Sequence, residues 1–160
     1  MRSAADARRL VVVAGLCWLD GRRLLVQRRA PTAAHGAGML EFPGGKVEPG
    51  EAPTEALARE LVEEWGEGAA AVRVGGIAEV LHHDYPPPGP EVILLLYHVD
   101  ASALGTEGAW GARLRVDGGE EVHEVALDAL DGGSFLAADR VLVARLRSGE
   151  LAPPPGIGVS

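Results

Sequence analysis

The sequence predicts an α/β (α+β) domain in which a mixed β-sheet is sandwiched between helices. Several short apolar runs, rich in β-branched residues and separated by turn signals, predict strands. Two segments with apolar residues at helical spacing predict one helix in mid-chain and another near the C-terminal end, an order that favours a layered architecture. The 160 residues fit one domain, and the 47% hydrophobic and 24% charged fractions are typical of a globular chain.

The first part of the chain is predicted to form a β-hairpin. Residues 10–19 are apolar and β-branched, which predicts a buried strand, and residues 23–27 predict its partner. The Asp-Gly pair at 20–21 is a turn signal between them. A loop of small and turn-forming residues over 30–38 then leads to a short strand over 39–42.

The clearest helix is predicted over residues 53–65. Leu57, Leu61 and Trp65 recur every four residues and form one apolar stripe. A proline at the first helical position and a glycine directly after the last one are typical of helix ends. The alanine before the proline carries no capping oxygen, so this end of the helix is expected to be weaker than with serine or threonine.

The second half of the chain is predicted to add further strands and a second helix. The run at 91–99 is apolar enough for a central strand of the sheet. The other expected elements are a strand over 70–82, a Pro/Gly loop over 85–90, a short strand over 113–116, a last strand over 122–127 and a helix over 137–147.

The predicted domain covers residues 10–149. Residues 1–9 are polar and Ala-rich, which predicts a loosely ordered N-terminus. Residues 150–160 form a Pro/Gly-rich tail, which we expect to be disordered from residue 151 onward.

Composition limits the classes of function that fit this chain. A single cysteine, Cys17, excludes an internal disulfide framework and a multi-cysteine metal site, and it fits a reducing, cytoplasmic location. No apolar run reaches the roughly 18 residues that predict a membrane span. A net charge of −8 argues against binding of duplex nucleic acid, but a phosphorylated small molecule can bind if divalent cations lie between the two.

Three glutamates of the predicted mid-chain helix are expected to share one face. Glu60, Glu63 and Glu64 stand at i, i+3 and i+4, a spacing that places carboxylates close enough to repel one another. Mg²⁺ or Mn²⁺ would offset this repulsion, because both ions prefer oxygen ligands. We expect the acidic face to point outward, opposite the apolar stripe; the alternative is an ordinary solvated acidic helix.

The loop before this helix, residues 43–52, contains three glycines and two prolines. Glycine permits close approach of the backbone to a ligand or a metal ion. Glu51 lies near the start of the helix, where it is expected to form an ion pair with Arg59.

The whole string resembles the Nudix box, G-x5-E-x7-R-E-U-x-E-E-x-G-U, in which U is an aliphatic residue. Every fixed position matches through Gly66, and the final aliphatic position is Glu67 here. Residues 40–51 (LEFPGGKVEPGE) and 135–146 (FLAADRVLVARL) are similar to the MutT branch of that family. The resemblance implies a Nudix fold over residues 10–146, either as a monomer or as a homodimer.

The resemblance also implies an activity. Nudix enzymes hydrolyse a nucleoside diphosphate linked to another group, and the MutT branch converts a nucleoside triphosphate to the monophosphate and pyrophosphate through a metal-associated water. It assigns Mg²⁺ or Mn²⁺ as cofactor, with the Gly44 carbonyl and the side chains of Glu60, Glu63 and Glu64 as ligands. Its catalytic residues are Glu51, Arg59, Glu60 and Glu63.

The general base stays open at this point. In this family it is either a glutamate of the box or a carboxylate of a later loop, where Asp117, Glu120 and Glu121 are the candidates.

By the same resemblance, Arg29 is expected to reach a substrate phosphate; the alternative is that it is a surface arginine at the end of a strand. Lys46 either contacts a phosphate as well or is solvated. His35, in a loop of small residues, is a candidate for lining the nucleoside pocket. His82, His83 and Tyr85 precede the proline loop and are candidates for the edge of the same cleft; the histidine pair has no third ligand for a transition metal, which favours an ordinary structural role.

Asp139 is expected to contact the base. The type enzyme of the MutT branch has an asparagine at the matching position, whereas the cytidine-triphosphate branch has an aspartate in a similar context. An ionised aspartate accepts hydrogen bonds only, which suits the cytosine amine; a protonated one would also suit 8-oxoguanine. The alternative is that Asp139 merely caps the last helix.

Two other functions remain compatible with these residues. One is hydrolysis of a different nucleoside diphosphate compound, such as a nucleotide sugar or a dinucleotide. The other is a nucleotide-binding module without turnover, although the intact acidic trio argues against it.

Overall fold

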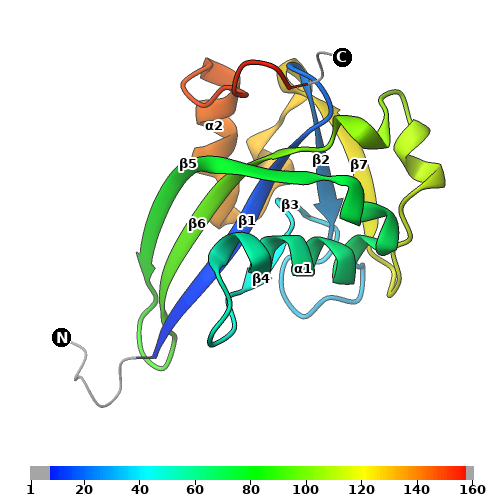
Figure 1. Ribbon diagram of the computed structural model, residues 1–160. Coiled ribbons are helices and arrows are strands. Elements are labelled where there is room, and N and C mark those ends of the chain that lie inside the picture. The colour runs from blue at the N-terminus through cyan, green and yellow to red at the C-terminus, as the bar shows by residue number, and fades with distance from the viewer. Residues whose placement is uncertain (1–7, 158–160) are drawn as a thin grey trace.

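The computed structural model describes residues 8–157 and shows one mixed β-sheet between two helices, which confirms the predicted fold class. Helix α1 crosses one face and α2 lies against the other (Figure 1). The helices are α1 (Pro53–Trp65) and α2 (Arg140–Ser148). The strands are β1 (Arg9–Trp18), β2 (Arg23–Arg28), β3 (Leu40–Glu41), β4 (Gly44–Lys46), β5 (Arg73–Asp84), β6 (Glu91–Asp100) and β7 (Glu121–Ala126).

Strand β1 is the central strand of the sheet, whose strand order is β3-β2-β1-β6-β5. It runs parallel to β6 over its whole length and antiparallel to its partners on the other edge. On that edge β1 pairs with β4 through Val12–Ala14 and with β2 only at Cys17 and Trp18. Because the partner changes along one edge, β4 and β2 diverge, and the candidate site described below lies where they separate.

The apolar stripe of α1 packs on the sheet as the sequence predicts. Leu57, Leu61 and Trp65 are fully buried in a cluster that also holds Val13 and Cys17. Complete burial of one leucine contributes about 1.5–3 kcal/mol, so this stripe fixes the helix firmly. The N-cap residue makes no side-chain hydrogen bond, as expected for an alanine.

The opposite face of the sheet is covered by α2. Leu142, Val143 and Leu146 are buried against residues of β1 and β2, and Phe42 and Phe135 add an aromatic contact with ring centroids 5.3 Å apart. The helix starts later than the sequence predicts, because residues 137–139 form a 3₁₀ turn (η6) ahead of it.

Three further expectations about local structure are wrong. Gly44–Lys46, expected in a loop, is a strand because it pairs with β1. Residues 113–116 are not a strand: they follow a 3₁₀ turn, and Leu114 and Val116 instead pack beside α1. Strand β5 begins at residue 73, since residues 67–71 form another 3₁₀ turn.

The predicted C-terminal tail is ordered where the structure describes it. Leu151 is buried with 6% of its surface exposed, and Ile157 packs against the same cluster as α2. The predicted disorder is therefore wrong for these residues, whereas residues 1–7 and 158–160 lie outside the described part. Within residues 8–157, no helix has the length and apolar character needed to cross a membrane.

Candidate active site

Arg59 is the centre of an ion-pair network on α1. Its Nε and Nη2 atoms donate to the two carboxylate oxygens of Glu51, both at 2.8 Å, and Nη2 also donates to the Lys46 carbonyl at 3.1 Å. Its Nη1 atom donates to Glu60 at 3.1 Å and to Glu63 at 3.2 Å. The predicted Glu51–Arg59 pair is confirmed, and Arg59 ties the loop before the helix to the glutamates on it.

This network perturbs Glu51 strongly. Hydrogen bonds from the Arg59 guanidinium, followed by one from the Glu48 backbone N–H, lower the pKa of Glu51 to about 2. Glu51 is therefore ionised throughout the neutral range and serves as a fixed anchor for Arg59.

Glu64 turns toward the sheet, so the expectation of an outward acidic face is wrong for this residue. Its Oε2 atom is buried and has no hydrogen-bond partner among the described residues, while the Gly44 backbone N–H donates to the same carboxylate. Burial, and after it the negative charges of Glu60, Glu41 and Glu120, raise the pKa of Glu64 to about 8.

Two glycines of β4 allow this close approach. A Cβ atom on Gly45 would lie 2.3 Å from the Glu60 carboxyl carbon, and a Cβ atom on Gly44 would lie 1.9 Å from the Val13 carbonyl oxygen. In the ladder with β1, the Gly15 N–H donates to the Pro43 carbonyl and the Val47 N–H donates to the Val11 carbonyl. Residues in such a ladder alternate between bonded and non-bonded pairs, and this register makes Gly44, which lies opposite Ala14, a member of a non-bonded pair. The Gly44 carbonyl therefore points away from β1.

The donors of this site fit a divalent cation in their chemistry. Within residues 8–157, no three acidic, histidine or cysteine side chains are gathered as a ready-made metal site, and Arg59 holds Glu60 and Glu63 in ion pairs. The buried, unpaired oxygen of Glu64 lies beside Gly44 and within the field of Glu60. A hard cation would satisfy this oxygen and relieve the repulsion between the carboxylates.

The structure separates the three loop carboxylates that are candidates for the general base. Glu120 accepts a hydrogen bond from Gln27 at 2.8 Å, and its charge acts on Glu64, so it belongs to the acidic site. Glu121 instead contacts His123 at 2.9 Å. Asp117 is exposed.

Two residues of the site, Glu41 and Gln27, are not among those predicted from the sequence. Glu41 on β3 forms an ion pair with Arg29 at 3.2 Å, and its charge raises the pKa values of both Glu64 and Asp139. Gln27 on β2 is the second. Glu41 stands between the apolar residues Leu40 and Phe42, and this alternation was the signal that it faces the other side of the strand.

Asp139 faces the end of β3 and does not cap α2. Its side chain makes no capping hydrogen bond; instead its carboxylate accepts from the Phe42 backbone N–H. Burial, and then the charge of Glu41, raise the pKa of Asp139 to about 7. The capping alternative is therefore excluded, and the carboxyl group is poised to change protonation near neutral pH.

The residues predicted to contact the phosphates and the nucleoside lie in different surroundings. Arg29 donates from Nε to the His35 carbonyl at 2.8 Å and pairs with Glu41, so it orders the loop over 30–38 at the edge of the acidic site. The His35 residue is exposed, as is Lys46, whose carbonyl is held by Arg59.

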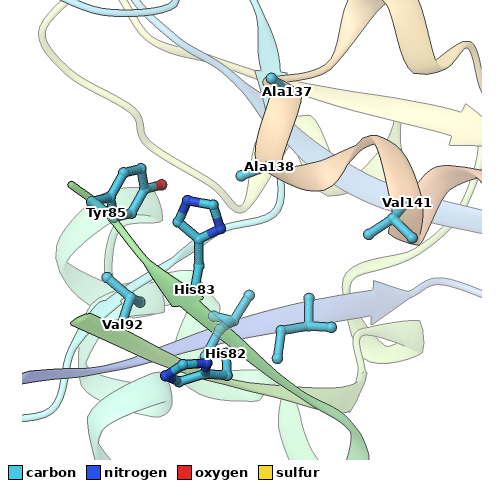
Figure 2. A pocket seen from close by; sticks show the side chains of 9 residues that line it. His82, His83, Tyr85, Val92, Ala137, Ala138 and Val141 are labelled. Atoms are coloured by element: carbon cyan, nitrogen blue, oxygen red, sulfur yellow. The ribbon is translucent and has the colours of Figure 1, made fainter. Parts of the chain in front are cut away.

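An apolar hollow of about 480 Å³ lies on the α2 face of the sheet, between the β5–β6 hairpin and the start of α2. Figure 2 shows His83 and Tyr85 from the hairpin facing Ala137 and Ala138 of η6 across it. The two rings pack edge to face with centroids 4.2 Å apart. Asp139 is the last residue of η6, so the hollow adjoins the carboxyl group that the sequence assigned to the base; His35 does not line it.

Comparison with known proteins agrees with this arrangement. A family model described as NUDIX domain matches residues 8–146. The 8-oxo-dGTP diphosphatase of Escherichia coli K12 is 30% identical over 141 residues, which cover 88% of this chain and 98% of that protein. The CTP pyrophosphohydrolase of the same organism is 53% identical over 55 residues, covering 34% of this chain and 39% of that protein.

Solved structures show the same fold. The MutT protein of Methanosarcina mazei Go1 superposes with a TM-score of 0.65 at 22% identity, covering 90% of this chain and 96% of that one. The E. coli ORF135 protein gives 0.66 at 24% identity and covers 92% and 95% of the two chains. The chain therefore belongs to the NUDIX domain family and is a MutT-like Nudix hydrolase.

Proposed function

We propose that this enzyme hydrolyses (deoxy)nucleoside triphosphates to the monophosphate and pyrophosphate in a reaction that depends on Mg²⁺ or Mn²⁺. The observation that carries the proposal is the acidic face of α1, folded against Gly44 and Gly45 with one carboxylate oxygen of Glu64 buried and unpaired. A triphosphate would be repelled by this face unless cations lie between them. The same chemistry in the cytoplasm would remove damaged nucleotides from the precursor pool for DNA synthesis.

The cation would be held by the side chains of Glu60, Glu63 and Glu64 and by the Gly44 carbonyl. When bound, it supplies positive charge to the phosphates and lowers the pKa of a water molecule. Glu63 is the most exposed of the three, with 57% of its side chain accessible, and it is free to exchange its Arg59 partner for this role.

The chain's own residues then orient the substrate and take up the proton. Arg59 and Glu51 keep the acidic face in place as one ion-paired unit. Glu120 is the loop carboxylate that we assign as general base, because its hydrogen bond with Gln27 keeps it beside the acidic site. Arg29 supplies a guanidinium group at the edge of the site, a group whose geometry suits phosphate oxygens.

We assign the base to the hollow beside His83 and Tyr85 (Figure 2), next to Asp139, which directly follows the lining residue Ala138 in the chain. An ionised Asp139 favours the amine of a cytosine nucleotide, whereas a protonated one accommodates 8-oxo-dGTP as well. The pKa of about 7 leaves both states accessible. The names of the two E. coli relatives, an 8-oxo-dGTP diphosphatase and a CTP pyrophosphohydrolase, support the same two substrates.

The test is product identification with Mg²⁺ and a panel of 8-oxo-dGTP, CTP, dCTP, 5-methyl-dCTP and ADP-ribose. The proposal predicts a nucleoside monophosphate and pyrophosphate without orthophosphate from at least one triphosphate. Turnover of ADP-ribose alone would instead indicate a hydrolase of other nucleoside diphosphate compounds. No turnover of any compound would favour a binding module.

A further inference from the structure

Gln27 is the one fully buried polar side chain among residues 8–157, with 2% of its surface exposed. It lies on β2, where its neighbours Leu25 and Val26 are entirely buried. A buried amide is costly unless its groups are hydrogen-bonded, so its partners show what it is for. Both partners belong to the region of the candidate active site.

The Gln27 amide connects the core to the acidic site. Its Oε1 atom accepts from the Trp65 indole Nε1 at 2.8 Å, and its Nε2 atom donates to the Glu120 carboxylate at 2.8 Å. An indole N–H can only donate and a carboxylate can only accept. The amide therefore has one satisfactory orientation, with its oxygen toward Trp65 and its nitrogen toward Glu120.

We propose that Gln27 is a positioning residue: held in one orientation by Trp65, it fixes the Glu120 carboxylate beside the acidic face of α1. The proposal rests on the proposed function, because Glu120 is useful there only if that face holds the cation and the reacting phosphate.

The loop before Glu120 needs such an anchor. Gly118 and Gly119 both have positive φ angles, 74° and 83°, and residues 114–120 form no helix or strand. Val122 packs on the α1 side of the sheet, so the alternation of β7 directs Glu120 to that side too. Strand β7 thus sets the side, and the Gln27 amide sets the position of the carboxylate.

The network also links the loop before β7 to helix α1, which that loop already meets through the hydrogen bond from the Arg115 backbone N–H to the Trp65 carbonyl at 2.7 Å. Trp65 is the last residue of α1, the helix that carries Glu60, Glu63 and Glu64. A chain of two hydrogen bonds, the first buried and the second partly buried, therefore connects the loop carboxylate to the helix that carries the other carboxylates. The opposing interpretation is that Gln27 only satisfies Trp65 in the core and that Glu120 is incidental.

A double-mutant cycle separates these interpretations. Gln27→Met removes both hydrogen bonds at similar volume, Glu120→Gln removes the carboxylate charge, and the double variant combines them. Trp65→Phe removes the indole N–H, together with part of the buried ring, and leaves Gln27 in place; it serves if Gln27→Met fails to fold. Trp110→Phe is the matched control, because the Trp110 indole donates to the Glu124 carboxylate at 2.8 Å away from the site.

We expect Gln27→Met to lower kcat by about 10- to 100-fold, the usual effect of losing a group that orients a site residue, with KM changed less than threefold. In the double variant, kcat should be less than twofold lower than in Glu120→Gln alone. Trp110→Phe should keep the wild-type kcat. The proposal would be overturned if the kcat losses of the two single variants multiplied in the double variant. A wild-type kcat in Gln27→Met or in Trp65→Phe would overturn it as well.

Binding of Mn²⁺, followed by electron paramagnetic resonance without substrate, gives a readout that does not depend on turnover. We expect the Kd to rise about tenfold in both Gln27→Met and Glu120→Gln, and no further in the double variant. If the wild-type chain lacks turnover, the proposed function fails while this measurement still decides the role of Gln27. An unchanged Kd in Gln27→Met would then contradict that role.

Discussion

At the scale of single residues, the unusual feature of this site is a carboxylate with one buried oxygen that has no hydrogen-bond partner. Glu64 has one oxygen without a hydrogen bond among the described residues and a pKa raised to about 8 by burial and neighbouring charges. Such a group destabilises the fold unless it is protonated or bound to a cation. Glu51, in the loop before α1, shows the opposite behaviour, because hydrogen bonds from the Arg59 guanidinium and from the Glu48 backbone N–H lower its pKa to about 2.

Glu64→Gln is expected to separate activity from folding. The amide keeps the size of the side chain but removes the charge that a cation needs, so kcat should fall by about 100-fold or more. The melting temperature without metal at pH 8 should be equal to that of the wild type or higher. Steady-state kinetics and calorimetry check both parts; wild-type kcat would refute the assignment of Glu64 as a ligand.

Asp139→Asn is expected to change substrate preference. An asparagine both donates and accepts at all pH values, so the ratio of kcat/KM for 8-oxo-dGTP to that for dCTP should rise about tenfold or more at pH 8. At pH 6, where Asp139 is mostly protonated in the wild type, the difference between variant and wild type should shrink. If the variant and the wild type gave the same ratio of kcat/KM values at both pH values, Asp139 would have no role in base recognition.

The residue scale also shows what the sequence could not supply. The ion pair between Glu51 and Arg59 follows from their positions around the start of a helix. The inward turn of Glu64 does not, because it depends on where β4 passes the helix. Gln27 was missed because one polar residue in an apolar strand gives no sign of its partners, which come from α1 and the β7 loop.

At the scale of secondary-structure elements, strand β4 decides how close the backbone comes to the acidic face of α1. Its two glycines, Gly44 and Gly45, avoid different steric clashes. A side chain on Gly44 would collide with the backbone of β1, whereas a side chain on Gly45 would displace only the flexible end of Glu60.

The two glycine-to-alanine variants should therefore differ. Gly44→Ala should destabilise the fold by about 1–3 kcal/mol, because β1 and β4 must separate. Gly45→Ala should keep its melting temperature within about 2 °C but weaken Mn²⁺ binding about tenfold, by the displacement of a ligand. Thermal unfolding and metal titration check the pair; equal effects on stability would contradict the assignment.

Element boundaries explain which predictions succeeded. The α1 stripe and the β1–β2 hairpin follow from local patterns and are confirmed. The β4 strand and the order of residues 151–157 depend on partners far away in the chain, and local patterns did not show them. The alternation along β7 did contain the information that separates Glu120 from Glu121, but it is usable only once the register of β7 is known.

At the scale of the whole molecule, the concentration of negative charge links stability to pH and to cations. Between its ordinary pKa of 4.5 and about 8, Glu64 keeps a proton in the folded chain that the unfolded chain has released. Asp139 does the same between 3.8 and about 7. Both therefore stabilise the fold less as pH rises through these ranges.

Without metal, the melting temperature is thus expected to fall by several degrees between pH 5 and pH 8. Addition of Mg²⁺ at pH 8 should recover part of the loss, since a ligand that binds only the folded state raises its stability. Calorimetric scans across pH check this, with Glu64→Gln as the control that flattens the profile. A wild-type melting temperature that rises steadily toward pH 8 without metal would contradict the burial of Glu64.

The central claim is that Glu64 exchanges a proton for a divalent cation. Titration of Mg²⁺ at pH 7, followed by calorimetry in buffers of different ionisation enthalpy, measures this exchange directly. The account predicts the release of about one proton per site in the wild type, because metal ligands must be deprotonated, and none in Glu64→Gln. Mg²⁺ binding without proton release in the wild type, or the same release in both chains, would contradict it.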